Sequence, residues 1–366
     1  MTRKNKAWKL MQYLLLATLM LLPYSGQAAN ETAAESGQKE KIDMTSLILG
    51  HISDSYEWHF WGEGENAVAI PLPILVYSNV RNEWFFFSFS HLEEAEENGT
   101  TYDGFKLAEA GEENAGKVVE FNNATGKWER PLDLSLTKNA IGLMINSLLL
   151  ICIVLGCARW YKGRKPSDPA PRGFVGLMEM MISMVYNDII KANIPQHVQR
   201  YSGYLLCAFF FIFFTNLIGL IPGSANITGN IAVTFVLACC TFLFVNIGAN
   251  GEYWKEIFWA DVPGWLKPIM AVIEFFGIFT KPVALMIRLF ANIMAGHAAL
   301  LALIGVIFIT ATISPVINGI MTPLSLLFAI FLDCLECLVA FIQAYVFTML
   351  SAVFIGLSVP QHHHKA

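Results

Sequence analysis

Charged residues are scarce in this chain of 366 residues, because Asp, Glu, Lys and Arg together make up only 14% of it. An ordinary soluble domain carries about 25% charged residues, and here 55% of the residues are hydrophobic. The shortage indicates that lipid rather than water surrounds most of the chain. The charges are also unevenly spread, since residues 31–137 hold 20 acidic and 7 basic residues, whereas residues 138–366 hold 9 and 13. An acidic, water-facing segment therefore precedes a sparsely charged membrane segment.

Cysteine is absent from the polar N-terminal segment, and all seven cysteines lie in apolar runs. This pattern argues against a disulfide framework. Cys334 and Cys337 have Cys-x-x-Cys spacing, but no second pair and no histidine cluster accompanies them, so we interpret them as two small apolar residues. The chain also lacks the His-Glu-x-x-His spacing of a zinc-binding helix, which argues against a membrane-embedded metalloenzyme. We expect no metal site, no cofactor and no nucleic-acid partner.

Residues 1–29 have the parts of a secretory signal peptide. Four basic residues precede position 10, an apolar core runs from Met11 to Leu22, and small residues follow up to Ala29. An uncleaved first membrane helix is the alternative. The apolar core has only about a dozen residues, whereas a membrane-spanning helix requires about 20, so the pattern favours a cleaved signal peptide.

Residues 30–137 are predicted to form a small acidic extracytoplasmic domain with some β structure. Residues 68–76 and 84–90 are alternating or aromatic runs, which are typical of strands. Three tripeptides match the N-glycosylation pattern, and we interpret them as chance matches; they begin at Asn98, Asn123 and Asn226. No pattern in this segment indicates its role.

The hydropathy of residues 138–366 predicts an all-α polytopic membrane domain with about five membrane helices. Three predicted spans are near the required length of about 20 residues, at roughly 139–160, 203–222 and 230–250. Two longer apolar tracts follow, at roughly 266–311 and 324–358, and a stretch with two prolines and a glycine separates them. At 1.5 Å per residue these tracts would be about 65 and 50 Å long, against a hydrocarbon core of about 30 Å. They must therefore be strongly tilted, broken or partly in the membrane plane.

The distribution of Lys and Arg predicts the orientation. The loop after the first span carries five basic residues between positions 159 and 172, whereas the connections at 222–230 and 312–323 carry none. Because basic loops face the cytoplasm, the N-terminal domain is predicted outside and the C-terminus inside. Residues 173–194 mix apolar and charged residues, which predicts an amphipathic helix on the cytoplasmic interface.

Ionisable side chains within the predicted spans are functional candidates, because each costs at least about 2.5–3.5 kcal/mol on insertion scales. The candidates are Glu274, Lys281, Arg288, His297, Asp333 and Glu336. Arg288 is the most informative, since its guanidinium stays protonated at any reachable pH and its apolar neighbours offer no counter-ion. We expect a buried, fixed positive charge that pairs either with an acid of this chain or with an acid on a partner.

Helical geometry relates the polar residues of this tract to Arg288. Asn292 is one turn away on the same face, whereas Glu274, fourteen residues back, lies about 20 Å away. His297, nine residues on, lies near the opposite face and about 13 Å along the helix.

Glu336 and Gln343 lie seven residues apart on the last predicted helix and therefore share a face. Together with the residues around Arg288, they form polar steps that lead from two directions to one arginine. Polar groups that only join helices would explain the amides, but not the arginine, the histidine and the carboxylates. The sequence therefore predicts an ion path through the membrane.

Three sequence blocks resemble signature blocks of subunit a of F-type ATP synthases. The most specific is residues 281–297, KPVALMIRLFANIMAGH, and the others are residues 215–223, TNLIGLIPG, and residues 341–347, FIQAYVF. They occur in the family's order and spacing, and the resemblance covers residues 138–359. It implies a non-catalytic, proton-translocating stator subunit in the plasma (inner) membrane of a bacterium.

The resemblance also implies partners and roles. Arg288 would face a rotating ring of c subunits and attract each ring carboxylate as that carboxylate loses its proton, between two aqueous half-channels that do not meet. The peripheral-stalk b subunits and the soluble ATPase head would be further partners in the complex. Glu274 matches the family's inner path, and the residues that match its outer path and arginine neighbourhood are Asn216, Asn292, His297, Glu336 and Gln343.

Two departures from the commonest bacterial pattern leave parts of this assignment open. The acid and the histidine are exchanged between positions 297 and 336, and Gly219 stands where an acid is common. The alternative function is a secondary ion transporter with a midplane site, which would predict internal repeats with paired broken helices. The sequence has no such repeat.

Overall fold

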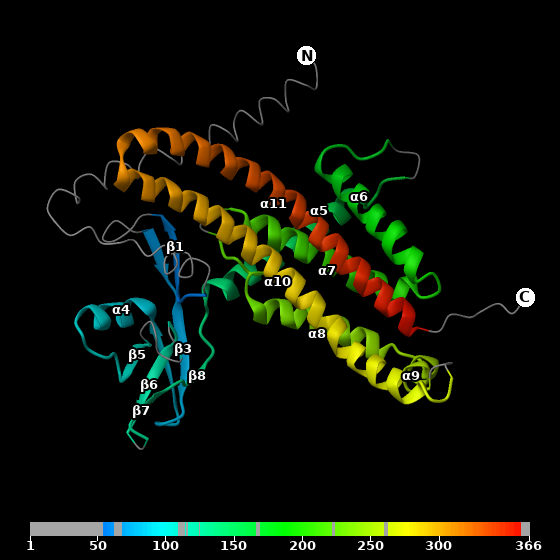
Figure 1. Cartoon of the computed structure of the whole chain (residues 1–366), viewed down its shortest axis with the longest axis horizontal. Coiled ribbons are helices and arrows are strands. Elements are labelled where there is room, and N and C mark those ends of the chain that lie inside the picture. Colours follow the sequence, from blue (N-terminus) through cyan, green and yellow to red (C-terminus); the bar gives the residue numbers. More distant parts are fainter. Residues whose placement is uncertain are drawn as a thin grey trace, which may run out of the picture. The chain divides into compact units, whose positions relative to one another are not determined.

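The computed structural model describes residues 54–61, 68–108, 114, 116–123, 125–165, 169–221, 224–259 and 263–359 (Figure 1). The predicted signal peptide and residues 30–53 of the predicted extracytoplasmic domain lie outside the described residues. Within them, a β-rich segment precedes a series of long helices. The predicted class, a polytopic helical membrane protein with a small N-terminal β region, is confirmed.

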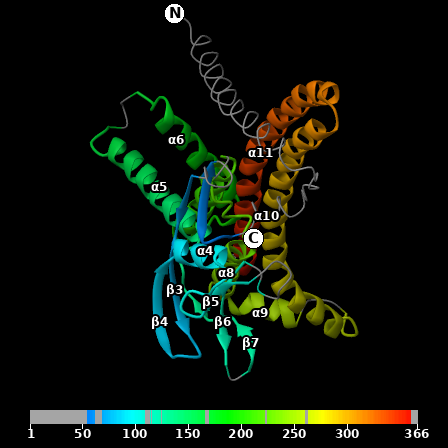
Figure 2. The same cartoon turned by 90° about the vertical axis from the view of Figure 1, so that its left-hand side faces the viewer.

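Short antiparallel strands and one helix build the β-rich segment (Figure 2). The elements are β1 (Glu57–Trp61), β2 (Val68–Pro71), β3 (Pro73–Ser78), β4 (Glu83–Ser88), α4 (Phe89–Glu97), β5 (Phe105–Leu107), β6 (Val118–Asn122), β7 (Lys127–Glu129) and β8 (Leu132–Asp133). They form three sheets, with the strand orders β1-β2, β4-β3-β8 and β5-β6-β7. The predicted strand at 84–90 is wrong at its end, because β4 ends at Ser88 and α4 begins at Phe89.

The β4-β3-β8 sheet buries one of its two faces. Along β3, Ile74 and Val76 are fully buried, while Leu75 and Tyr77 remain partly exposed. The buried face packs against α4 and the β5-β6 pair, around the ring of Phe105. This period of two follows from the alternation of side chains along a strand, and it is typical of a sheet with one covered face.

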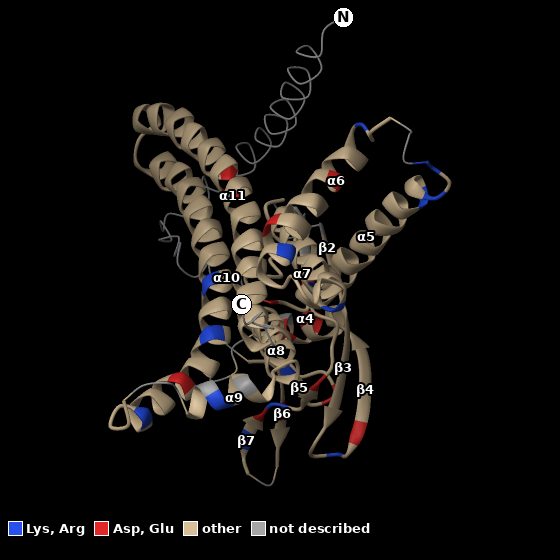
Figure 3. Cartoon of the chain, turned by 90° about the vertical axis from the view of Figure 1, so that its right-hand side faces the viewer, with Lys and Arg blue, Asp and Glu red and all other residues tan. Residues whose placement is uncertain are grey.

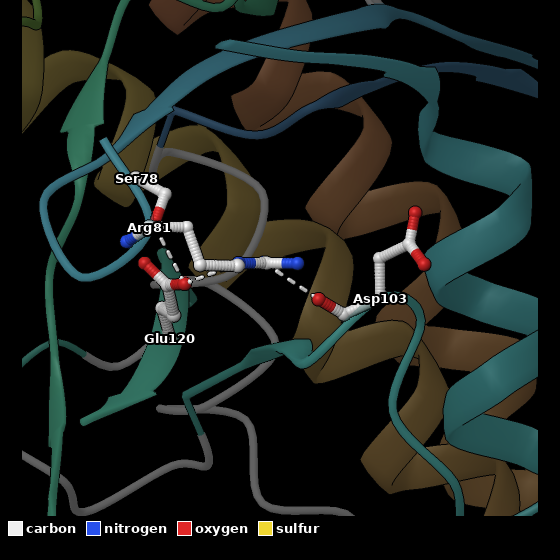
Figure 4. A network of polar contacts seen from close by, with 4 residues as sticks. All are labelled: Ser78, Arg81, Asp103 and Glu120. Atoms are coloured by element: carbon white, nitrogen blue, oxygen red, sulfur yellow. Dashed lines mark hydrogen bonds and ion pairs between the residues drawn. The ribbon is translucent and has the colours of Figure 1, made fainter. Parts of the chain in front are cut away.

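A paired charge lies inside the β-rich segment (Figure 4). Glu120 is only 4% exposed, and its Oε1 accepts hydrogen bonds from Ser78 Oγ at 2.7 Å and from Arg81 Nε at 2.9 Å. Arg81 Nη2 donates to the main-chain oxygen of Asp103 at 2.7 Å, and its guanidinium lies 4.0 Å from the centroid of the Phe85 ring. A buried carboxylate is tolerated when it is paired and hydrogen-bonded, so this cluster ties the β3–β4 turn to β6.

Four helices among the described residues are long and apolar enough to cross a membrane. They are α5 (Lys138–Tyr161), α7 (Val198–Gly219), α10 (Lys267–Ile313) and α11 (Pro315–Ser358). α8 (Ile231–Ile247) is apolar but shorter, with 17 residues. Figure 3 shows few charged bands along these helices.

Shorter helices connect the long ones. The stretch predicted as one amphipathic helix forms two, α6 (Phe174–Met184) and the π-helix η2 (Val185–Lys191). Ile189 and Ile190 are fully buried while Asp188 is exposed, so the stretch is amphipathic as expected. Its place on the cytoplasmic interface stays a prediction. α9 (Gly251–Phe258) follows α8.

α10 and α11 are the longest helices of the described chain, with 47 and 44 residues. At 1.5 Å per residue they are about 70 and 66 Å long, more than twice the hydrocarbon core of about 30 Å. They lie side by side in Figures 1 and 2, and Ser314 alone separates them.

The prolines do not break these two helices, so the predicted separation over residues 315–323 is wrong. α11 begins at Pro315, and Pro282 and Pro323 lie inside α10 and α11. Proline is favoured in the first turn of a helix because its missing N–H has no intrahelical partner there. Within membrane helices proline is tolerated, because neighbouring groups satisfy the freed carbonyl.

The helical core centres on α7 and α11. Phe209 of α7 and Phe347 of α11 are almost fully buried. α11 presents small residues to its neighbours, and a Cβ at Gly356 would collide with the main-chain oxygen of Asn193. This close packing holds α11 in register against the rest of the bundle, and α10 packs along it.

Candidate functional site

A small cavity lies where α7, α10 and α11 meet. Its lining residues are Asn216, Gly219 and Leu220 at the end of α7, Asn292, Ile293, Gly296 and His297 of α10, and Glu336 and Val339 of α11. The cavity holds about 20 Å³, which is enough for a water molecule. Four of the seven predicted site residues thus line one cavity, although they come from three helices.

Asn216 reaches this cavity from the last turn of α7 and is only 2% exposed. Its Oδ1 accepts a hydrogen bond of 2.9 Å from Thr228 Oγ1, in the loop before α8. Thr228 is buried too, and it ends the Asn226-Ile-Thr tripeptide that matches the glycosylation pattern. Sequence reasoning missed Thr228, which is one of several polar residues in the loop before α8 and carries no signal that distinguishes it from the others.

Glu336 approaches α10 closely at Gly296. A Cβ at Gly296 would lie 2.5 Å from Glu336 Oε1, inside van der Waals distance, so glycine leaves the room that the carboxylate occupies. His297 is the next residue along α10, and it lines the same cavity. The structure therefore brings His297 and Glu336 to one place, which the sequence could only suggest.

Three polar atoms of the cavity residues have no hydrogen-bond partner among the described residues: Asn216 Nδ2, Asn292 Nδ2 and Glu336 Oε1. A buried polar group left unpaired costs about 1–3 kcal/mol. Water inside a polar cavity typically makes about three hydrogen bonds to such groups. The arrangement is therefore suited to hold water beside a carboxylate and an imidazole, which can exchange protons with it.

Arg288 lies on the exposed side of α10, one turn before Asn292, and it does not line the cavity. The expectation of a buried arginine is wrong for the chain by itself. Among the described residues, Arg288 has no carboxylate within 4.0 Å. Ala284, Ala291 and Ala295 are exposed as well, and their spacing places them on the same side of the helix. The arginine is therefore presented on a surface of small residues.

Gln343 and Glu274 lie away from this cavity. Gln343 is 6% exposed, two turns past Glu336 on α11, and its Nε2 has no hydrogen-bond partner in the described part of the chain. Glu274 is partly exposed near α9, where burial and then the Glu274 carboxylate raise the pKa of the Tyr253 hydroxyl.

A second cavity of about 20 Å³ lies on the other side of Arg288 along α10. It is lined by Thr241, Phe242, Val245 and Asn246 of α8, Tyr253 of α9, Ile278, Lys281 and Pro282 of α10, and Phe354 and Leu357 of α11. The Lys281 Nζ lies 5.5 Å from the centroid of the Phe354 ring. Lys281 and Arg288 are seven residues apart, about 10 Å along the helix. Two cavities thus flank Arg288, and no residue lines both.

No group of three or more His, Cys, Asp or Glu side chains within the described ranges is placed to hold a metal ion. Cys334 and Cys337 are free cysteines on the exposed surface of α11.

Known proteins resemble both parts of the chain. The ATP synthase A chain family matches residues 142–356, and a domain of unknown function (DUF8433) matches residues 47–134. ATP synthase subunit a of Chloroherpeton thalassium is 42% identical over 236 residues, which are 63% of this chain and 69% of that one. The Myxococcus xanthus subunit a is 41% identical over 246 residues, or 65% and 78% of the two chains. This chain is therefore a polytopic membrane protein of the ATP synthase A chain family, with the proton-translocating role of that family.

Proposed function

We propose that this chain is the membrane stator subunit of an F-type ATP synthase, where it provides two half-channels for protons moving to and from a ring of c subunits. The chain then has no catalytic site of its own, and it couples proton flow to rotation and so to ATP synthesis in the soluble head. One observation carries the proposal: Arg288 stands on the exposed side of a membrane helix, and no carboxylate of the described chain lies within 4.0 Å.

The chemistry of Arg288 suits a moving carboxyl partner. A carboxyl group surrounded by lipid resists ionisation, and a nearby cation favours its charged form. A ring carboxyl that reaches Arg288 would therefore release its proton there and take up another after leaving. The exposed Ala284, Ala291 and Ala295 support this role, because small residues let membrane helices approach closely.

The two cavities along α10 support separate half-channels. We assign Asn216, Asn292, His297, Glu336 and Gln343 to the outer path, which includes the cavity between α7, α10 and α11. Glu274 belongs to the inner path, on the side of the cavity around Lys281. The charge of Arg288 lies between them and would repel a proton that tried to pass directly.

The proposed orientation places the N-terminal domain outside and the C-terminus in the cytoplasm, in the plasma (inner) membrane. This orientation is supported by the five basic residues between positions 159 and 172, because loops rich in Lys and Arg face the cytoplasm. Peripheral-stalk b subunits would hold the chain against rotation. At Gly219, where an acid is common in the family, the atom nearest to an added Cβ is Asn226 Oδ1 at 4.0 Å, and the hydrogen-bonded pair of Asn216 and Thr228 supplies further polar groups of the outer path.

Arg288→Ala tests the proposal directly. In inverted membrane vesicles that contain the assembled complex, this change should abolish ATP-driven proton pumping, because no cation would favour the charged ring carboxylate. Arg200→Ala is the matched control, since Arg200 is an exposed arginine near the start of α7. Immunoblots should show equal amounts of all subunits in both variants. Pumping by the Arg288→Ala complex above a small fraction of the control, at normal assembly, would refute the proposal.

A further inference from the structure

The β4-β3-β8 sheet has a second face, opposite its buried one, that stays largely exposed. Directly paired residues of neighbouring strands share a face. In the register of this sheet, Tyr77 of β3 pairs with Trp84 of β4 and with Leu132 of β8, so these three side chains lie on one side. Leu75 and Phe86, two residues further along their strands, are paired and lie on the same side.

This apolar sheet face consists of Leu75, Tyr77, Trp84, Phe86, Leu132 and Leu134. Phe86 is 74% exposed, and Trp84, Leu132 and Leu134 are each more than half exposed. The face holds no charged residue, and in Figure 3 β3 and β4 are coloured as charged only near their joining turn. A continuous exposed apolar surface marks contact with another protein or with a membrane.

The chain ties the apolar sheet face to the first membrane helix. Leu134 N donates to the main-chain oxygen of Leu75 at 3.0 Å, and Leu136 N to that of Pro73 at 3.3 Å. The pairing with β3 therefore continues up to Thr137, which is the N-cap of α5. No flexible linker separates this sheet from the membrane span.

Two further hydrogen bonds fasten the start of α5 to the β-rich segment. Lys138 N donates to the main-chain oxygen of Ser55 at 3.0 Å, and Asn139 N donates to Asp54 Oδ1 at 3.1 Å. From Met144 onwards α5 exposes large apolar side chains, as a lipid-facing helix does. Met144 is six residues, or about 9 Å, into the helix, so the lipid begins close to the sheet.

We propose that the apolar sheet face rests on the lipid surface beside the N-terminal end of α5, so that the β-rich segment is a membrane-surface domain. Trp and Tyr favour the headgroup region because each joins an apolar ring to a polar tip. The face carries one of each, while its Phe and Leu side chains provide the apolar area that binds at the headgroup boundary. Since the face holds no charge, its contact with lipid requires no charged group to lose water.

A lipid surface fits the position of this face better than a protein does. The face is continuous with a helix whose next exposed side chains meet lipid, and the bilayer covers both without a further component. The inference does not depend on which side of the membrane the segment occupies, nor on Arg288.

Site-specific fluorescence in the whole chain tests this proposal. In a variant with all seven cysteines replaced by alanine, Phe86→Cys is labelled with a nitrobenzoxadiazole group and the chain is reconstituted into phosphatidylcholine liposomes. Phe121→Cys is the matched control, because Phe121 is an aromatic residue, 40% exposed, on β6 of another sheet. Lipids with a nitroxide on the headgroup should quench most of the emission at position 86 and little at position 121. Iodide, present on both sides of the bilayer, should quench little of the emission at position 86 and most of it at position 121.

Two results would overturn the proposal. Equal quenching by iodide at both positions, without an effect of the nitroxide lipid, would show that water covers the apolar sheet face. Protection of position 86 from both quenchers, in liposomes that contain either the chain alone or the purified complex, would show that a protein covers it. Trp84→Cys provides a second labelled position on the same face, and it must show the same quenching as position 86. The test therefore remains decisive if the Phe86→Cys variant folds poorly. Proton pumping is not a readout, so this test and that of the proposed function fail independently.

Discussion

Gly296→Ala should displace the Glu336 carboxylate and slow the movement of protons through the cavity between α7, α10 and α11. A Cβ at position 296 would lie 2.5 Å from Glu336 Oε1, whereas ordinary contact begins at 3.4 Å. The oxygen must therefore retreat by about 0.9 Å. The methyl group would also lie 3.0 and 3.2 Å from the Cδ and Cγ atoms of Glu336, so rotation of the carboxylate alone does not relieve the clash. A misplacement of about 1 Å in a reacting group costs up to about 100-fold in rate.

ATP-driven proton pumping by inverted vesicles measures this effect. Pumping by Gly296→Ala should fall by about 10- to 100-fold, while the amount of assembled complex stays normal because alanine is a better helix former than glycine. Gly203→Ala is the matched control, since a Cβ at this position of α7 meets no atom within 4 Å. Glu336→Asp, which shortens the side chain by one methylene, should restore part of the pumping when it is combined with Gly296→Ala.

The reasoning fails on either of two results. Pumping by Gly296→Ala within about twofold of the Gly203→Ala control would show that the carboxylate position does not limit proton movement. A loss that Glu336→Asp leaves unchanged would show that something other than the displaced carboxylate causes it.

Cysteines introduced at Thr100 and Arg164 report the orientation: a membrane-impermeant thiol reagent should label the first and not the second in intact cells, and the reverse would refute the proposed topology. If His297 and Glu336 form one proton-handling pair, the exchanged double mutant should pump better than the product of the two single-mutant fractions; losses that simply multiply would show independent action. Tyr56 lies outside the membrane helices, and its pKa is raised above the ordinary value of 10, first by burial and then by a hydrogen bond to a carboxylate. The folded state therefore holds this proton more tightly than the unfolded state, so stability of the β-rich segment should fall as pH rises above about 10. Tyr56→Phe should flatten that fall in tryptophan-monitored unfolding, and an unchanged slope would contradict the linkage.

The helical part of the fold could be predicted because long apolar runs have few alternatives. α5 lies within one residue of its predicted span at each end, since Thr137 and the basic residues after Tyr161 mark its limits. The start of α11 could not be predicted. A proline is usually interpreted as a helix breaker, but Pro315 occupies a first turn, and Pro323 lies inside the helix, as membrane helices tolerate.

The candidate site could be predicted in part, because an amide or an ionisable group stands out in an apolar run. Asn216, Asn292, His297 and Glu336 carry that signal. Gly296 does not, since its contribution is the absence of a side chain, which matters only once the Glu336 carboxylate is placed opposite. The exposure of Arg288 could not be predicted from the sequence either, because periodicity assigns residues to faces of a helix but does not tell which face a neighbouring helix covers.

Ser314 is the single residue between α10 and α11, and across this turn Thr310 Oγ1 donates to Asn318 Oδ1 at 3.1 Å. Within α11, Thr322 Oγ1 donates to the same oxygen at 3.0 Å. A connection of one residue cannot absorb a change of length without moving one helix relative to the other. One extra residue there would rotate every position of α11 by about 100° and shift it by about 1.5 Å relative to α10. Glu336, twenty-two residues downstream, would then point away from the cavity. Most loops tolerate changes of length in evolution, but in this family functional chains should tolerate substitutions at the joint far better than insertions or deletions.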